Sequence, residues 1–79
     1  MSQLAFIMMN VKVGTDKEVV SRLRKLKGVT AVYEVYAVYD IVAIVEAATM
    51  AELNQLVNSE VRKIEDITST NTIIGEKIS

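Results

Sequence analysis

The chain has 79 residues, of which 51% are hydrophobic and 24% are charged, and its formal net charge is −1. This length fits a single small domain over residues 1–79, and the composition is typical of globular rather than disordered proteins. The nearly neutral charge gives no electrostatic basis for direct DNA binding, which needs a concentrated basic surface.

The chain contains neither His nor Cys. It therefore lacks the commonest general base, the thiol nucleophile and the best transition-metal ligands. We predict that it is not an enzyme, that it has no catalytic residues, and that it needs no cofactor and no metal.

No segment of the chain has the properties of a membrane span or a signal peptide. The longest nearly apolar run, Val35–Val45, contains Asp40 and is much shorter than the roughly 20 residues that a membrane span needs. The first residues, Met1–Leu4, lack the basic region of a signal peptide. We therefore expect a cytoplasmic protein that does not bind membranes.

The first predicted elements are a strand at Leu4–Val13 and a helix that begins after Gly14. Both faces of the strand are apolar for most of its length. Thr15 and Glu18 have the spacing of a capping box, in which their side chains accept backbone N–H groups at the start of a helix. Gly28 stands where a left-handed residue commonly ends a helix. Between them runs an apolar stripe at helical spacing: Val19, Val20, Leu23 and Leu26.

The stretch Val29–Glu46 predicts two consecutive strands, Val29–Tyr36 and Asp40–Glu46. β-Branched and aromatic residues dominate both strands and suit a pleated, packed surface. Strict alternation places one set of side chains on one face: Val29, Ala31, Tyr33, Val35, Ile41, Ala43 and Val45. The other face is also largely apolar, with Val32, Tyr36, Val42 and Ile44. Since a sheet with one face in water would alternate apolar and polar residues, we expect both faces to be covered.

A second helix of about fourteen residues is predicted to begin at Thr49, which forms a second capping box with Glu52. Its apolar stripe comprises Leu53, Leu56, Val57, Val61 and Ile64. The last strand is predicted at Ile67–Ile74. Its alternation places Thr68, Thr70 and Thr72 on one face and Ile67, Ser69, Asn71 and Ile73 on the other.

The predicted order is strand, helix, strand, strand, helix, strand. With a right-handed crossover, this order gives an α+β, ferredoxin-like βαββαβ topology in which both helices cover one face of an antiparallel sheet. The uncovered face keeps an apolar patch, which is formed either by Leu4, Phe6, Met8, Val42 and Ile44 or by the side chains of the opposite register. Because such a patch marks an interface and a small core gains stability from association, we expect a homodimer.

Two features could carry binding chemistry. Asp40 lies in an apolar hairpin, where a carboxylate must stay hydrated or find a partner. The favoured interpretation is that it accepts hydrogen bonds from backbone amides of the turn. The other feature is the polar run Thr68–Thr72, which taken alone is ordinary strand composition because Thr has good β propensity.

Three segments, taken together in this order and spacing, resemble a known family. They are AFIMMNVKVGTDKEVVSRLRKL, GVTAVYEVYAVYDIVAIVEA and ITSTNTII. They resemble the RAM domain (regulation of amino acid metabolism), which is the effector-binding domain of the leucine-responsive/AsnC family of transcription regulators. The resemblance covers nearly the whole chain. The chain looks like a stand-alone RAM domain without the helix-turn-helix half of the full-length regulators.

The resemblance implies protomers that dimerise sheet against sheet, as in dimeric α/β barrels, and that assemble further into octamers or decamers. It also implies an amino-acid effector, bound between neighbouring dimers near the loop joining the second and third strands, and full-length relatives as partners. Tyr39 and Asp40 match the second half of the family motif in this loop, whereas Ala37 and Val38 replace its Gly and its polar residue. The family's Thr-x-Thr in the last strand matches two further residues. The implied ligand-binding residues are therefore Tyr39, Asp40, Thr70 and Thr72.

Three interpretations of the function stay open. The first is an oligomeric, amino-acid-binding module for transcription regulation, with an ACT-type domain as a related alternative. The second is a purely structural assembly module whose ligand site has decayed, which Ala37 and Val38 favour. The third is a small dimeric ferredoxin-like enzyme, such as a monooxygenase or isomerase, which the absence of His and Trp disfavours.

Overall fold

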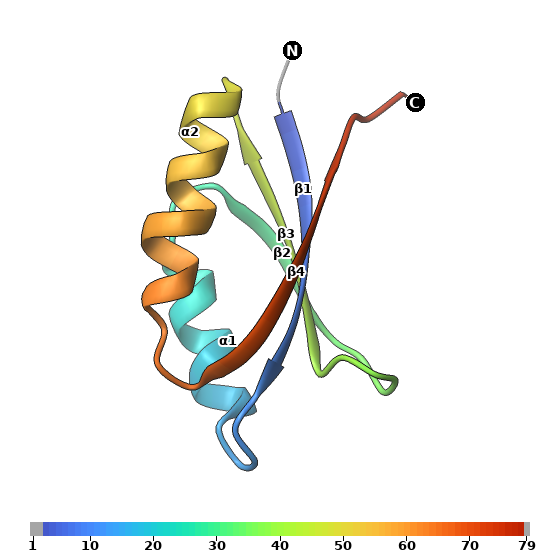
Figure 1. Ribbon diagram of the computed structural model, residues 1–79, viewed down its shortest axis with the longest axis vertical. Helices are drawn as coiled ribbons and strands as arrows, with labels where there is room; N and C mark the ends of the chain where they lie inside the picture. Colours follow the sequence, from blue (N-terminus) through green and yellow to red (C-terminus); the bar gives the residue numbers. More distant parts are fainter. Residues whose placement is uncertain (1–2, 79) are drawn as a thin grey trace.

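The computed structural model describes residues 3–78 of the chain. Its elements are β1 (Gln3–Val11), α1 (Asp16–Arg24), β2 (Val29–Glu34), β3 (Ile41–Ala47), α2 (Met50–Gln55) and β4 (Ile67–Gly75). The four strands form one antiparallel sheet in the order β2-β3-β1-β4, and both helices lie on the same side of it (Figure 1). This is the ferredoxin-like βαββαβ fold that the sequence predicts.

The second helix has the predicted length but not a uniform geometry. α2 continues into a π-helical turn, η1 (Leu56–Glu60), and then into a 3-10 turn, η2 (Val61–Lys63). The whole helical segment therefore covers residues 50–63, as expected from its apolar stripe.

The two predicted capping boxes have different outcomes. Thr49 Oγ1 accepts the backbone N–H of Glu52 at 3.2 Å, which is one half of the predicted box; within residues 3–78 the Glu52 side chain does not accept the Thr49 N–H in return. The Thr15 hydroxyl instead donates to the Lys12 carbonyl at 2.6 Å and makes no cap hydrogen bond. Glu18 pairs with Arg22, with 3.1 Å between Oε1 and Nη2. The capping box predicted at Thr15 is therefore wrong, because the tight turn between β1 and α1 uses the hydroxyl.

The core lies between the helices and the face of the sheet that they cover. Every side chain that is buried in residues 3–78 is apolar. The predicted helical stripes and the alternating residues of β1 and β3 meet in one cluster: Ala5, Ile7, Met9, Val19, Leu23, Ile41, Ala43, Val45, Leu53, Val57, Val61 and Ile64.

The other face of the sheet, here called the open face, has no helix over it within residues 3–78 (Figure 1). On β1 and β3, this face carries the predicted apolar patch, in which Phe6 pairs with Ile44 and Met8 pairs with Val42. These side chains are only partly buried in a single protomer. The face therefore leaves part of its apolar surface in contact with water.

A β-bulge changes the faces predicted for β2. The register shifts between Val29 and Ala31. Val29 pairs with the core residue Val45, whereas Ala31 and Tyr33 pair with open-face residues of β3. The prediction that Val29, Ala31 and Tyr33 share one face is wrong, because the extra residue of a bulge reverses the alternation beyond it.

A second register shift occurs at the start of β4. Ile67 packs against the core, whereas Ser69 lies on the open face, so the prediction that these two residues share a face is also wrong. Beyond the shift the alternation is regular. Thr70 and Thr72 lie on the helix-covered side, opposite core residues of β1, and Asn71 lies on the open face.

Two strands end two residues earlier than predicted. β1 ends at Val11 rather than Val13, and β2 ends at Glu34 rather than Tyr36. β3 begins only at Ile41, so the chain around Tyr36 has no neighbouring strand with which to pair. Both ends lead into loops at the same end of the sheet (Figure 1).

Two glycines have similar positive φ angles but differ in how closely the rest of the chain packs around them. Gly14 has φ +83° and Gly28 has φ +102°. A Cβ atom at Gly28 would lie 2.8 Å from Leu56 Cδ2 and 3.1 Å from the Glu46 carbonyl oxygen, whereas at Gly14 it would meet nothing within 4 Å. Both positions would strain an L-residue by about 1–2 kcal/mol, but only Gly28 adds a steric clash.

We predict that Gly14→Ala lowers the free energy of unfolding by about 1–2 kcal/mol and that Gly28→Ala lowers it by about 2–5 kcal/mol. Urea denaturation of both variants at one protomer concentration measures the difference. Equal losses at the two sites would contradict the packing argument.

Candidate functional site

Asp40 fixes the foot of the β2–β3 hairpin onto β1. Its backbone N–H donates to the Met9 carbonyl at 3.0 Å, and its carbonyl accepts the N–H of Val35 at 2.9 Å. Its carboxylate Oδ2 accepts the backbone N–H of Val11, at the end of β1, at 3.0 Å. Asp40 thus satisfies a backbone amide, as the favoured interpretation held, but the amide belongs to β1 and not to the hairpin turn.

A cavity of about 210 Å³ lies beside Asp40, between the β1–α1 turn and the β2–β3 loop. Its lining includes apolar residues, one Lys and three acidic residues. The lining residues are Val11, Lys12, Val13, Gly14, Asp16, Glu34, Val35, Tyr36 and Asp40. The carboxylates can accept hydrogen bonds from a cationic group, and the Lys12 ammonium can donate to an anionic one. The cavity can therefore hold a small ligand that carries both charges.

The loops around this cavity present apolar side chains to water. The exposed fractions are 103% for Val13, 95% for Tyr36 and 81% for Val38. Val38 is one of the two positions at which the loop departs from the family motif. Three large apolar side chains at one end of a small protein mark a surface that is suited to contact with another molecule.

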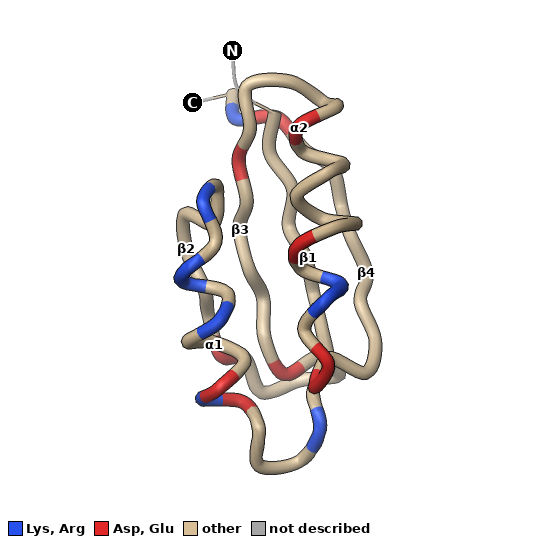
Figure 2. Tube along the Cα trace, turned by 90° about the vertical axis from the view of Figure 1, so that its left-hand side faces the viewer, with Lys and Arg blue, Asp and Glu red and all other residues tan. Residues whose placement is uncertain are grey.

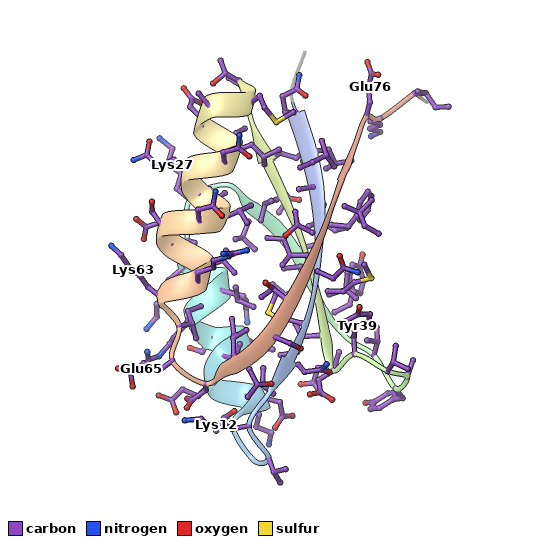
Figure 3. All side chains as sticks on the ribbon, viewed as in Figure 1. Lys12, Lys27, Tyr39, Lys63, Glu65 and Glu76 are labelled. Carbon is purple, nitrogen blue, oxygen red and sulfur yellow. The ribbon has the colours of Figure 1, made fainter. Side chains whose placement is uncertain are left out.

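Tyr39 contacts a different surface from Asp40. Its hydroxyl accepts a hydrogen bond from Nδ2 of Asn71 at 3.2 Å. Asn71 lies on the open face of β4, opposite Met8. Figure 3 shows Tyr39 on the side of the sheet away from the helices. The two neighbouring loop residues therefore point to the open face and to the cavity, respectively.

Thr70 and Thr72 lie apart from the cavity at Asp40. They face the helix-covered side of β4, opposite Met9 and Ile7, and neither lines the cavity. Within one protomer, Tyr39 and Asp40 are neighbours in the sequence, but the two threonines do not lie beside them. Of the four predicted site residues, only Asp40 lines this cavity.

The structure adds Asn10, which the sequence analysis did not single out, to the polar run of β4. Asn10 Nδ2 donates to Ser69 Oγ at 3.1 Å on the open face. Together with Asn71 and Tyr39, this pair forms a polar end of an otherwise apolar surface. A signal for it exists in the sequence, since Asn10 ends an apolar strand and Ser69 and Asn71 alternate in another. The sequence alone does not show that these residues are neighbours, because their contact depends on the register between β1 and β4.

The charges on the helices have an ordinary distribution. Asp16 and Glu18 lie in the first turn of α1 and Arg22 and Arg24 in its last, which favours the helix dipole (Figure 2). No group of His, Cys, Asp and Glu side chains within residues 3–78 is arranged to hold a metal ion. In the same part of the chain, no helix is long and apolar enough to cross a membrane.

Comparison with solved structures gives matches over nearly the whole chain. The crystal structure of FFRP-DM1 has a TM-score of 0.89 and 34% sequence identity, covering 94% of this chain and 99% of that chain. AsnC from E. coli has a TM-score of 0.86 and 25% identity over 96% of this chain. The match covers 52% of AsnC, so this chain spans about half the length of that regulator.

A more distant structure shares the fold. The transcriptional regulator NMB0573 from Neisseria meningitidis, solved as a complex with L-Met, has a TM-score of 0.83 at 14% identity, over 95% of this chain and 50% of that chain. A comparison with proteins of curated function gave no match. The model of the family described as the Lrp/AsnC ligand binding domain matches residues 4–75. The chain therefore belongs to the Lrp/AsnC family, as its ligand-binding RAM domain.

Proposed function

We propose that this regulatory ligand-binding domain binds an amino acid at a site shared between protomers, and that the ligand changes the assembly state. The observation that carries the proposal is the cavity beside Asp40. Within residues 3–78, one carboxylate oxygen of Asp40, Oδ2, is engaged by the chain itself. The other oxygen is available to accept a hydrogen bond from a ligand ammonium.

The chemistry of the cavity suits an α-amino acid. Such a ligand needs acceptors for its ammonium group and donors for its carboxylate. Asp40, Glu34 and Asp16 supply acceptors, and Lys12 supplies donors. Because carboxylates outnumber the ammonium, acidic amino acids are the least suitable ligands. The L-Met complex of NMB0573 supports the class of ligand, since that protein has the same fold.

The remaining residues of the proposed site come from a neighbouring protomer. β4 is an edge strand, so its Thr70 and Thr72 are accessible to another copy of the chain. In the proposed site their hydroxyls complete the hydrogen bonds of a ligand held at Asp40, and Tyr39 supports the loop from the open face. A ligand that contacts two protomers binds the assembled state better and shifts the population towards it.

We further infer that the protomers pair through their open faces. Phe6, Met8 and Val42 leave apolar surface exposed there, and Tyr33 and Ile73 are 56% and 50% exposed. Obligate dimer interfaces resemble a domain core cut in half, which fits this face. The apolar loop residues Val13, Tyr36 and Val38 then provide contacts for further assembly into octamers or decamers, alone or with full-length relatives.

A purely structural assembly module is the second candidate. It is favoured by Val38, which is 81% exposed where the family motif has a polar residue. In this case the loop contacts a neighbouring protomer and binds no ligand. Titration with amino acids distinguishes the two candidates.

The pairing of open faces predicts that the parent protein has the mass of two chains or more at micromolar concentration. Met8→Lys places an ammonium group in the proposed interface. This variant should be monomeric and should have a lower free energy of unfolding than the parent. Met50→Lys makes the same chemical change on α2, where the side chain is 39% exposed, and should leave the mass unchanged. Light scattering measures the masses of the parent and of both variants. A folded, monomeric parent would contradict the proposed pairing.

The proposed ligand site predicts that at least one of the twenty amino acids raises the melting temperature of the parent. Asp40→Asn keeps an acceptor for the Val11 N–H but removes the charge, so affinity should fall roughly 10- to 100-fold with little change in stability. Thr70→Val should also weaken binding, whereas Thr68→Val, at the bulge, should not.

Isothermal titration of these variants with the amino acid that the thermal screen selects measures the change in affinity. Equal affinity for the parent, Asp40→Asn and Thr70→Val would show that the site is wrongly assigned. If no amino acid binds the parent at millimolar concentration, the assembly module replaces the proposed function.

The charge of the chain, −1, predicts no sequence-specific binding to duplex DNA by this domain alone. A gel-shift titration with the pure protein at 50 mM and 200 mM salt checks this. A complex that depends on the DNA sequence and persists at the higher salt would overturn the expectation.

A further inference from the structure

The hairpin loop, residues 35–40, is attached to the rest of the chain at two different surfaces. At the cavity, the Asp40 carboxylate accepts the N–H of Val11. On the open face, the Tyr39 hydroxyl lies 3.2 Å from Nδ2 of Asn71 and accepts its hydrogen bond. Tyr39 does not line the cavity. The loop therefore connects the proposed ligand site with the face through which we expect protomers to pair (Figure 3).

The hydrogen bond from Asn71 to Tyr39 reaches across a strand. In the sheet order β2-β3-β1-β4, β1 lies between the hairpin and β4. Asn71 stands opposite Met8 of β1, so Tyr39 extends over β1 to reach the edge strand. Asn71 also lies between Thr70 and Thr72 in the sequence. The bond thus joins the hairpin loop to the part of β4 that, in the proposed assembly, contributes Thr70 and Thr72 to the site of a neighbouring protomer.

The rest of the hairpin loop is weakly held. Within residues 3–78, Tyr36, Ala37 and Val38 make no hydrogen bond. Tyr36 and Val38 are 95% and 81% exposed. Below them, the backbone bond between Val35 and Asp40 closes the loop at 2.9 Å. Because packing restricts these residues little, the attachment of Tyr39 removes a large share of the freedom of the loop.

We propose that Asn71 is a positioning residue for the ligand site, which acts by holding Tyr39 across β1 and thereby fixing the loop that carries Asp40. This inference rests on the proposed function, because it concerns how ligand binding at the same site is regulated. A ligand at Asp40 favours one position of the loop. Because Tyr39 belongs to that loop, the ligand also favours one position of the Tyr39 side chain on the open face. Since coupling between sites is reciprocal, pairing of protomers raises ligand affinity by the same factor by which the ligand favours pairing.

Amide hydrogen exchange tests this link without a ligand. Asn71→Ala removes the donor, and Tyr39→Phe removes the acceptor but keeps the ring. We expect both variants to exchange about two- to tenfold faster than the parent at the foot of the loop. The double variant should match the single variants, since both changes remove the same bond. The amides to follow are those of Val11, Val35 and Asp40, whose hydrogen bonds depend on the loop.

Two controls separate positioning from a general loss of stability. Core amides such as that of Ile7 report global opening, and their exchange should change less than that of the loop. Asn10→Ala removes a similar bond, from Asn10 Nδ2 to Ser69 Oγ at 3.1 Å, on the same face. It should leave exchange in the loop as in the parent. Loop exchange that is unchanged in both Asn71→Ala and Tyr39→Phe would overturn the inference.

A linkage measurement tests the regulatory part. The dimer dissociation constant is measured with and without the amino acid that gives the largest thermal shift among the standard twenty. The ligand should tighten the dimer of the parent and of Asn10→Ala, and this effect should be lost in Asn71→Ala. If an amino acid binds and the effect persists in Asn71→Ala, the inference alone fails. If none binds the parent, the proposed function fails and this regulation fails with it.

Discussion

The hydrogen bonds that Asp40 makes with β1 are the constraint on which the hairpin end of the molecule depends. Its backbone N–H donates to the carbonyl of Met9 and its carboxylate accepts the N–H of Val11, so one residue holds the hairpin at two positions of the first strand, two residues apart. A hydrogen bond to a charged acceptor is stronger than one between neutral groups. The hairpin is therefore fixed to β1 beside the cavity that Asp40 lines.

The open face differs in character between its two ends. On the open face, apolar pairs such as Phe6 with Ile44 give way towards the hairpin to the pairs Asn10–Ser69 and Asn71–Tyr39. Amide and hydroxyl groups keep their hydrogen bonds when water leaves, whereas unpaired polar groups would oppose burial. The polar end can therefore lie at the rim of a packed interface, next to the loops, while the apolar end supplies most of the area removed from water.

The sequence predicted the elements and their order because hydrophobic periodicity is a local signal. The prediction from sequence failed where a single residue changes the strand register or the helix cap. The bulge near Ala31 has no signature in composition, yet it moves Tyr33 to the open face. Thr15 has the right spacing for a cap, but a carbonyl in its own turn competes for the hydroxyl. The role of Asp40 as a partner for backbone amides was predictable. Its contact with Val11, 29 positions away, and the cavity that the two loops form both depend on tertiary register.

The three tyrosines of the chain, which contains no Trp, stand in three distinct surroundings. Tyr33 lies on the open face, Tyr36 projects from the loop beside the cavity, and Tyr39 bonds to Asn71. Ultraviolet emission from this protein is therefore a sum of three signals that originate from the open face, the loop tip and the connection between them. Replacing two of the rings by Phe leaves a single native fluorophore in a chosen position. The chain thus carries its own spectroscopic reporters, and no dye has to be attached to a domain this small.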